Sequence, residues 1–267
     1  MEQQYGICRV AVAPLRTEPS DKAEISTQLL FGDHVEVLEK QEKWWQVRNA
    51  YDDYEGWMDF RQLADISMEG YVANHNCDFL APAQINNMII DAEGSKYYLS
   101  PSSNLPLYND GFCYLGTTKY QVLFEPHVVS AGAERSIIDT ALFFQNVPYL
   151  WGGKNVFGID CSGLVQTVFK LNGIRLHRDA YQQAEQGETV DFLTEVQPGD
   201  VAFFDNEAGR ITHVGIMINP AEIIHASGKV RIDPMDNQGI YNPELAKYTH
   251  KLRIIKRYPI VNSFYNT

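Results

Sequence analysis

One cysteine and two histidines stand in short apolar segments and have side chains that can carry out nucleophilic catalysis. Cys161 lies in Ile-Asp-Cys-Ser-Gly-Leu-Val (159–165), His213 follows 52 residues later in Ile-Thr-His-Val-Gly-Ile, and His225 lies in Ile-Ile-His-Ala-Ser-Gly. A thiolate is a strong nucleophile, and an imidazole can remove the thiol proton and later protonate a leaving amine. Such a set can form a nucleophile, Cys161, a base, His213, and a residue, His225, that fixes the tautomer of the base.

Each of these residues also has a plainer explanation. A cysteine in an apolar segment is most often an inert part of a core, and a histidine in a strand is most often a hydrogen-bonded structural residue. A single cysteine with distant histidines is therefore only a candidate nucleophile on general grounds.

The segment that follows Cys161 has the pattern of a helix. Its apolar stripe and the glycine at position 173 indicate a helix that begins at the cysteine and ends before Gly173. The positive end of the helix dipole would favour the thiolate of Cys161. Asp160 and Ser162 beside the cysteine are also residue types that commonly cap a helix or occupy its first turn.

Composition limits the class of partner. The chain has 267 residues, 45% of them hydrophobic, which allows one to three packed domains. Its net charge of −12 argues against a nucleic-acid partner and is compatible with a substrate that carries free amines.

The four cysteines have no metal-binding spacing, and nothing in the sequence implies a metal or an organic cofactor. With Cys161 set aside, three remain, and an odd number does not suggest a disulfide framework. The chain shows no basic start followed by an apolar run and no stretch of 18 apolar residues. We therefore expect no membrane partner and a cytoplasmic location, although an exported protein whose leader has been removed would look the same.

The pattern of short segments changes along the chain. Up to residue 68, alternating apolar residues broken by Gly, Asp and Pro predict a small antiparallel barrel, with strands at 10–16, 27–32, 34–38, 44–48 and 54–58. Residues 69–127 contain weaker strand patterns at 97–99, 105–108, 112–116 and 120–123. Residues 128–267 predict a helix at 137–145, the helix after Cys161, and strands at 201–204, 213–218, 222–225 and 252–258, which is an α+β arrangement.

Four motifs in this last part resemble the NlpC/P60 cysteine peptidases, papain-like enzymes that cut cell-wall peptides. They are Pro-Tyr-Leu-Trp-Gly-Gly (148–153), Gly-Ile-Asp-Cys-Ser-Gly-Leu-Val (158–165), Gln-Pro-Gly-Asp-Val (197–201) and Thr-His-Val-Gly-Ile (212–216). Residues 8–64 resemble a bacterial SH3 (SH3b) domain, and by analogy we interpret 69–127 as a second, divergent one. The resemblance implies an NlpC/P60 catalytic domain preceded by two small SH3b-type β-barrels, with Cys161, His213 and His225 as the catalytic residues.

The chain looks most like the branch of this family with N-terminal SH3b domains, the γ-D-glutamyl-L-diamino-acid endopeptidases (dipeptidyl-peptidase VI). The resemblance implies that Tyr149, Asp160, Ser162 and Asp179 line the substrate site, with Trp151 beside them, and that an acidic residue of the first SH3b domain, for which we choose Glu55, narrows the cleft. Ala180 replaces the hydroxyl residue expected after Asp179. A buried substrate ammonium must meet carboxylates, and Asp160 and Asp179 are candidates. The backbone N–H of Cys161 and the Tyr149 hydroxyl would hold the oxyanion.

Plainer explanations exist for these residues too. Tyr149 and Trp151 could be core aromatics, Glu55 an exposed loop carboxylate, and Arg178-Asp179 a surface pair of little energetic value.

The leading hypothesis is a cysteine endopeptidase that cuts the γ-D-Glu–L-diamino-acid bond of short murein peptides with a free N-terminal L-Ala. The diamino acid, lysine or diaminopimelate, is left open. One alternative is a hydrolase or amidase that acts on intact cell wall and is anchored to that polymer by its SH3b domains. Another is a non-catalytic binding module, which the presence of all three catalytic residue types disfavours.

Overall fold

The computed structural model describes residues 3–73, 77–129 and 137–259. The chain forms two compact units: residues 1–129 with 154–156, and residues 130–153 with 157–267. Within the described ranges, no helix is long and apolar enough to cross a membrane.

The first unit begins with a seven-stranded antiparallel sheet in the order β3-β2-β6-β5-β4-β1-β7. Its elements are β1 (Gln4–Cys8), β2 (Val12–Arg16), β3 (Ile25–Leu30), β4 (His34–Gln41), β5 (Trp44–Asn49), β6 (Glu55–Asp59), the short 3-10 helix η1 (Phe60–Gln62), β7 (Leu63–Ile66) and helix α1 (Met68–Ala73). The five predicted strands of this region are confirmed. Side chains alternate along β2, where Ala13 and Leu15 are buried, as expected for a strand with one face on a core.

A second group of strands follows in the same unit. It contains β8 (Phe79–Leu80), β9 (Asn87–Asp91), β10 (Lys96–Leu99), β11 (Phe112–Leu115), β12 (Thr118–Val122), β13 (His127–Val128) and, later in the chain, β14 (Lys154–Asn155). Four of them form a sheet in the order β10-β9-β12-β11. The strand predicted at 105–108 is wrong: Pro106 has no N–H to donate, and Leu107 has φ 50°, which a strand residue does not adopt.

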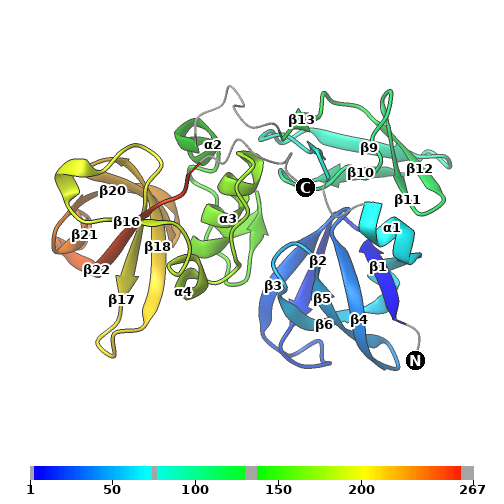
Figure 1. The fold of residues 1–267 in the computed structure, drawn as a ribbon, viewed down its shortest axis with the longest axis horizontal. Helices are drawn as coiled ribbons and strands as arrows, with labels where there is room; N and C mark the ends of the chain where they lie inside the picture. The colour runs from blue at the N-terminus through cyan, green and yellow to red at the C-terminus, as the bar shows by residue number, and fades with distance from the viewer. Residues whose placement is uncertain (1–2, 74–76, 130–136, 260–267) are drawn as a thin grey trace. The chain divides into compact units, whose positions relative to one another are not determined.

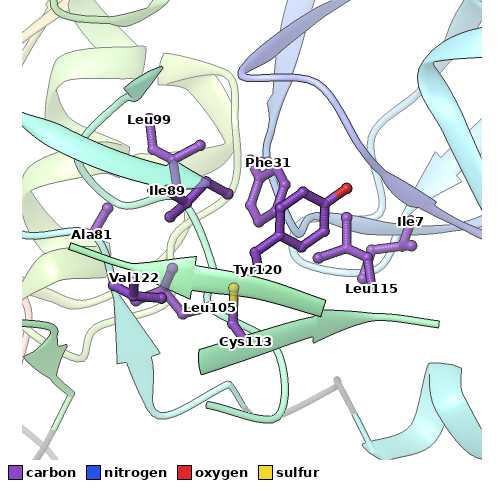
Figure 2. Packing of buried hydrophobic residues seen from close by; sticks show 10 residues of the cluster. All are labelled: Ile7, Phe31, Ala81, Ile89, Leu99, Leu105, Cys113, Leu115, Tyr120 and Val122. Carbon is purple, nitrogen blue, oxygen red and sulfur yellow. The ribbon is translucent and has the colours of Figure 1, made fainter. Parts of the chain in front are cut away.

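The two sheets of the first unit share buried side chains, which Figure 2 shows from close by. Ile7 from β1 and Phe31 from the turn after β3 pack with Leu115 and Tyr120 from the second sheet, and the rings of Phe31 and Tyr120 meet edge to face at 5.3 Å. The prediction of small β-rich domains is therefore confirmed at the level of strands and sheets. The closure of each into an SH3b-type barrel, and the division at residue 68, stay predictions.

The second unit places helices before its sheet, as predicted. Its elements are α2 (Ile137–Phe143), β15 (Gly158–Ile159), α3 (Cys161–Leu171), α4 (Ala180–Gln183), β16 (Glu188–Val190), the 3-10 helix η2 (Leu193–Glu195), β17 (Val201–Asp205), β18 (Ile211–Asn219), β19 (Glu222–Ser227), β20 (Lys229–Asp236), β21 (Gly239–Asn242) and β22 (Lys247–Arg257). The helix predicted at 137–145 corresponds to α2, which ends at Phe143. Figure 1 shows α3 beside the sheet, and α3 packs against β18.

The sheet of the second unit closes on itself. Its order is β16-β22-β17-β18-β19-β20-β21, and β21 also pairs with β22. The ring encloses a core that includes Phe204, Met217 and Ile223. His213 lies on the same face of β18 as Met217, and His225 on the same face of β19 as Ile223, because side chains of a strand alternate. The two histidines therefore extend the row of interior side chains.

Helix α3 presents Cys161 as its first residue. The Asp160 side chain caps the helix by accepting a hydrogen bond from the Gly163 N–H at 2.6 Å. The helix ends where predicted, since Gly173 takes φ 75° just after the C-cap residue Asn172. All eleven residues of α3 are buried, so packing on every side fixes its position.

Candidate active site

A chain of three buried polar side chains crosses neighbouring strands of the second unit. Nε2 of His213 lies 2.8 Å from Nδ1 of His225, and Nε2 of His225 lies 3.0 Å from Oδ2 of Asp233. His225 and Asp233 are diagonal neighbours on β19 and β20, whose register pairs Ile223 with Asp233 and His225 with Arg231. The contact expected between the two predicted histidines is thus present, and the chain continues one residue further than the sequence indicated.

The imidazoles of this chain are held in a dry environment. Burial, together with the neighbouring His250 and His225, places the pKa of His213 well below its ordinary value. His250 stacks on His213 with 4.0 Å between ring centroids, and burial beside His225 lowers the pKa of His250 to about 4. At neutral pH both rings are therefore uncharged, and a neutral imidazole is the form that accepts a proton.

His213, His225 and His250 are also the kind of cluster that could hold a metal ion, with ligand atoms within 4.8 Å of one another. Two nitrogens bound to one tetrahedral zinc at about 2.0–2.1 Å each would lie about 3.3 Å apart. The 2.8 Å between the facing nitrogens of His213 and His225 is shorter and matches a hydrogen bond. The geometry therefore favours a hydrogen-bonded chain of side chains over a metal centre.

The sulfur of Cys161 lies beside β18, where the backbone N–H of Val214 bonds to it, as does that of Ser162. Burial, reinforced by the charge of Asp160, raises the pKa of the Cys161 thiol to about 12 despite these N–H groups and Arg178. The N–H groups at the start of α3 favour the thiolate, but desolvation of the charged form outweighs them. The resting thiol is protonated and needs a base, and the residue before Val214 is His213.

Asp160 and Arg178 form a buried ion pair directly before the nucleophile. Nη1 and Nη2 of Arg178 donate to the two oxygens of Asp160 at 3.0 and 2.6 Å, and the arginine side chain is 1% exposed. Arg178 also donates to Ser162 Oγ at 2.8 Å, and the Gly152 N–H donates to Asp160 at 2.8 Å. The interpretation of Arg178 as half of a surface pair with Asp179 is wrong. Arg178 instead holds both residues that flank Cys161.

Tyr149 is fixed next to the nucleophile by the backbone. Residues 148–150 pair with Ile159, two positions before Cys161: the Ile159 N–H donates to Pro148 O at 3.1 Å and the Leu150 N–H to Ile159 O at 3.2 Å. Burial and the nearby Cys161 raise the pKa of the Tyr149 hydroxyl to about 12, so it stays a donor at neutral pH. Tyr149 is half-buried.

The other predicted substrate residues have distinct surroundings. Trp151 is 61% exposed, so the core explanation fails for it. Asp179 is half-buried and forms the N-cap of α4, in a capping box with Gln182. Glu55 lies in β6 of the first unit, opposite Arg48, whose guanidinium donates to it at 2.7 Å. It is a paired strand residue, not a loop carboxylate, and its role toward a substrate stays a prediction, as do those of Asp160, Ser162 and Asp179.

The sequence also matches two family models. The model described as NlpC/P60 family matches residues 146–249, and the one described as bacterial dipeptidyl-peptidase Sh3 domain matches residues 15–63. The gamma-D-glutamyl-L-lysine dipeptidyl-peptidase of Bacillus subtilis is 33% identical over 76% of this chain and 72% of its own length. The dipeptidyl-peptidase 6 of Lysinibacillus sphaericus is 30% identical over 88% of this chain and 93% of its own length.

The chain belongs to the NlpC/P60 family. It is an NlpC/P60 cysteine peptidase with an N-terminal SH3b domain. A solved NlpC/P60 family protein from Bacillus cereus shares its fold, with a TM-score of 0.80 and 23% identity over 95% of this chain and 99% of the other.

Sequence reasoning missed three residues of this NlpC/P60 site. Asp233 and Arg231 alternate with apolar residues in β20, which is the pattern of a strand. A carboxylate eight positions after His225 could face that histidine across a hairpin. Both residues were missed because no strand was predicted there. His250 gave no signal, because β22 starts five residues earlier than the predicted strand.

Proposed function

We propose that this NlpC/P60 peptidase cuts the γ-D-Glu–L-diamino-acid bond of short murein peptides whose N-terminal L-Ala is free. One structural observation carries the proposal: a buried Cys161 thiol bonded to the N–H of Val214, the residue after His213, whose neutral ring is hydrogen-bonded to His225. Relatives named for cleavage at γ-D-glutamyl-L-lysine, similar over most of their length, support the substrate class.

The geometry supports a two-step acyl transfer. His213 takes the Cys161 proton as the sulfur attacks the γ-carbonyl carbon, and its imidazolium then protonates the departing amine. Water, deprotonated by His213, hydrolyses the thioester and frees the dipeptide acid. The N–H of Cys161, which has no intrahelical acceptor at the first position of α3, and the Tyr149 hydroxyl would hold the oxyanion.

Recognition of the substrate ammonium requires a carboxylate whose negative charge is not already neutralised by a neighbouring cation. The charge of Asp160 is balanced by Arg178, so we assign the larger part of this role to Asp179. Asp179→Asn should raise KM for the peptide with a free N-terminus.

The experiment compares L-Ala-γ-D-Glu-L-Lys with its N-acetylated form by mass spectrometry. Release of L-Ala-D-Glu from the free form alone, lost in Cys161→Ala and kept in Cys77→Ala, is the expected result. Cys77 is a matched control, since it is a half-buried thiol of the first unit. Equal cleavage of both forms would discard the ammonium site, and cleavage of neither would discard the proposed substrate.

A hydrolase of intact wall is the second candidate, because the catalytic part alone resembles a wall enzyme. The murein DD-endopeptidase/LD-carboxypeptidase of Escherichia coli is 37% identical over 39% of this chain. Co-sedimentation with purified sacculi and release of muropeptides would favour it, and free peptide cleavage without sacculus binding would count against it.

A further inference from the structure

Asp233 is a buried carboxylate placed at the end of the histidine chain. Its side chain is 2% exposed and that of His225 is 1% exposed. Arg231 donates to Asp233 Oδ1 at 2.9 Å, and its Nε lies 2.8 Å from Oδ2. Burial alone would raise the pKa of Asp233, but the bonds from His225 and Arg231 lower it, so the group is an ionised acceptor at neutral pH.

An ionised carboxylate can only accept hydrogen bonds, which sets the direction of the whole chain. The nitrogen of His225 that faces Asp233 is Nε2, so Nε2 carries the hydrogen. In the neutral ring Nδ1 is then an acceptor, and it lies 2.8 Å from Nε2 of His213. Nε2 of His213 must therefore carry a hydrogen too, which leaves Nδ1 of His213 as its unprotonated nitrogen.

Nδ1 is the ring nitrogen nearer to the main chain, and the Cys161 sulfur accepts from the backbone N–H of Val214, the next residue. In the reaction the S–H bond of Cys161 breaks and an N–H bond forms at Nδ1 of His213. His213 becomes an imidazolium that keeps its bond to His225, and no proton moves to His225 or Asp233.

We propose that Asp233 is a positioning residue which, through His225, fixes the tautomers of both histidines so that Nδ1 of His213 faces Cys161 as the base. The inference rests on the proposed cysteine-peptidase function of this site and is independent of which peptide the site cuts. Arg231 supports the same arrangement by holding the carboxylate in its ionised form, and Nη1 of Arg231 lies 3.2 Å from Oε2 of Glu244.

The first test is NMR of the wild-type chain labelled with ¹⁵N-histidine, without substrate. Two-bond correlations should report protonated Nε2 on both His213 and His225, assigned with His213→Gln and His225→Gln variants. Protonation of Nδ1 alone on either ring would overturn the proposal. Because no substrate is present, this result does not depend on the proposed specificity.

The second test is Asp233→Asn, with Asp236→Asn as the matched control. Asp236 lies on the same strand and bonds to Tyr248 at the surface. An asparagine can turn its NH₂ toward His225, which reverses both tautomers and places a hydrogen on Nδ1 of His213. We expect Asp233→Asn to lower kcat about 10²- to 10³-fold with KM unchanged and to move the ¹⁵N pattern of both rings.

The control should keep wild-type kcat and the wild-type ¹⁵N pattern. A folded Asp233→Asn with wild-type kcat, or with lowered kcat and an unchanged ¹⁵N pattern, would overturn the proposal. If Asp233→Asn fails to fold, the wild-type spectrum decides alone.

Discussion

Removing the guanidinium of Arg178 should destabilise the second unit more than any ordinary surface substitution. In Arg178→Met the Asp160 carboxylate loses two charge-assisted bonds, at 3.0 and 2.6 Å, in a place where the arginine was 1% exposed. Leaving one partner of a buried pair uncompensated costs about 3–5 kcal/mol. For a domain of this size that corresponds to a fall in Tm of about 10–25 °C.

The assay is differential scanning calorimetry of the full chain, combined with a double-mutant cycle. Asp160→Asn keeps an acceptor for the Gly163 N–H but removes the charge, so adding it to Arg178→Met should restore stability by at least roughly 2 kcal/mol. Arg253→Met is the control, because Arg253 is 64% exposed and 3.9 Å from Asp205. A loss in Arg178→Met no larger than in the control, or simple additivity in the cycle, would refute the reasoning.

Three further predictions concern single side chains of the site and its supports. His213 and His250 have folded pKa values below the ordinary 6.5, so the unfolded chain binds more protons and stability falls as pH drops from about 6.5 towards 4. His250→Gln should reduce the slope of unfolding free energy against pH in that window by the equivalent of up to one proton. An unchanged slope would contradict the burial of a neutral His250 as a cause of this pH dependence. Gly163→Ala should abolish activity or folding, because the added Cβ would lie 2.3 Å from the Gly153 carbonyl oxygen. Gly70→Ala should be tolerated, because its Cβ would have no neighbour nearer than 3.6 Å. Equal solubility and activity of the two variants would count against the close packing of Gly163 on Gly153. Tyr149→Phe should lower kcat about 10- to 100-fold while leaving alkylation of Cys161 by iodoacetamide unchanged, and unchanged kcat would remove the tyrosine from the oxyanion site.

The local elements could be predicted from the sequence because their signals are local. Helix α3 carries its cap residue, its apolar residues and its terminating glycine within a short stretch, and β18 and β19 are apolar runs interrupted by one histidine each. The resemblance to the NlpC/P60 motifs then predicted that His213 and His225 meet, and their facing nitrogens lie 2.8 Å apart.

What the sequence could not predict depends on side chains that meet only after folding. Arg178 appeared to be a partner of Asp179, its neighbour in sequence, but the fold directs it 18 positions back to Asp160. The contact of Asp233 with His225 could not be predicted without the pairing register of β19 and β20. The state of the Cys161 thiol depended on the balance of helix dipole against burial, and the degree of burial is a tertiary property.

The most direct test of the account is to trap the covalent intermediate. Wild-type protein mixed with L-Ala-γ-D-Glu-L-Lys and acid-quenched within milliseconds should carry an L-Ala-γ-D-Glu acyl group on the peptide that contains Cys161, seen by mass spectrometry, and Cys161→Ala should carry none and release no lysine. Continued release of lysine by Cys161→Ala, or an acyl group on another residue, would contradict the assignment of Cys161 as the nucleophile.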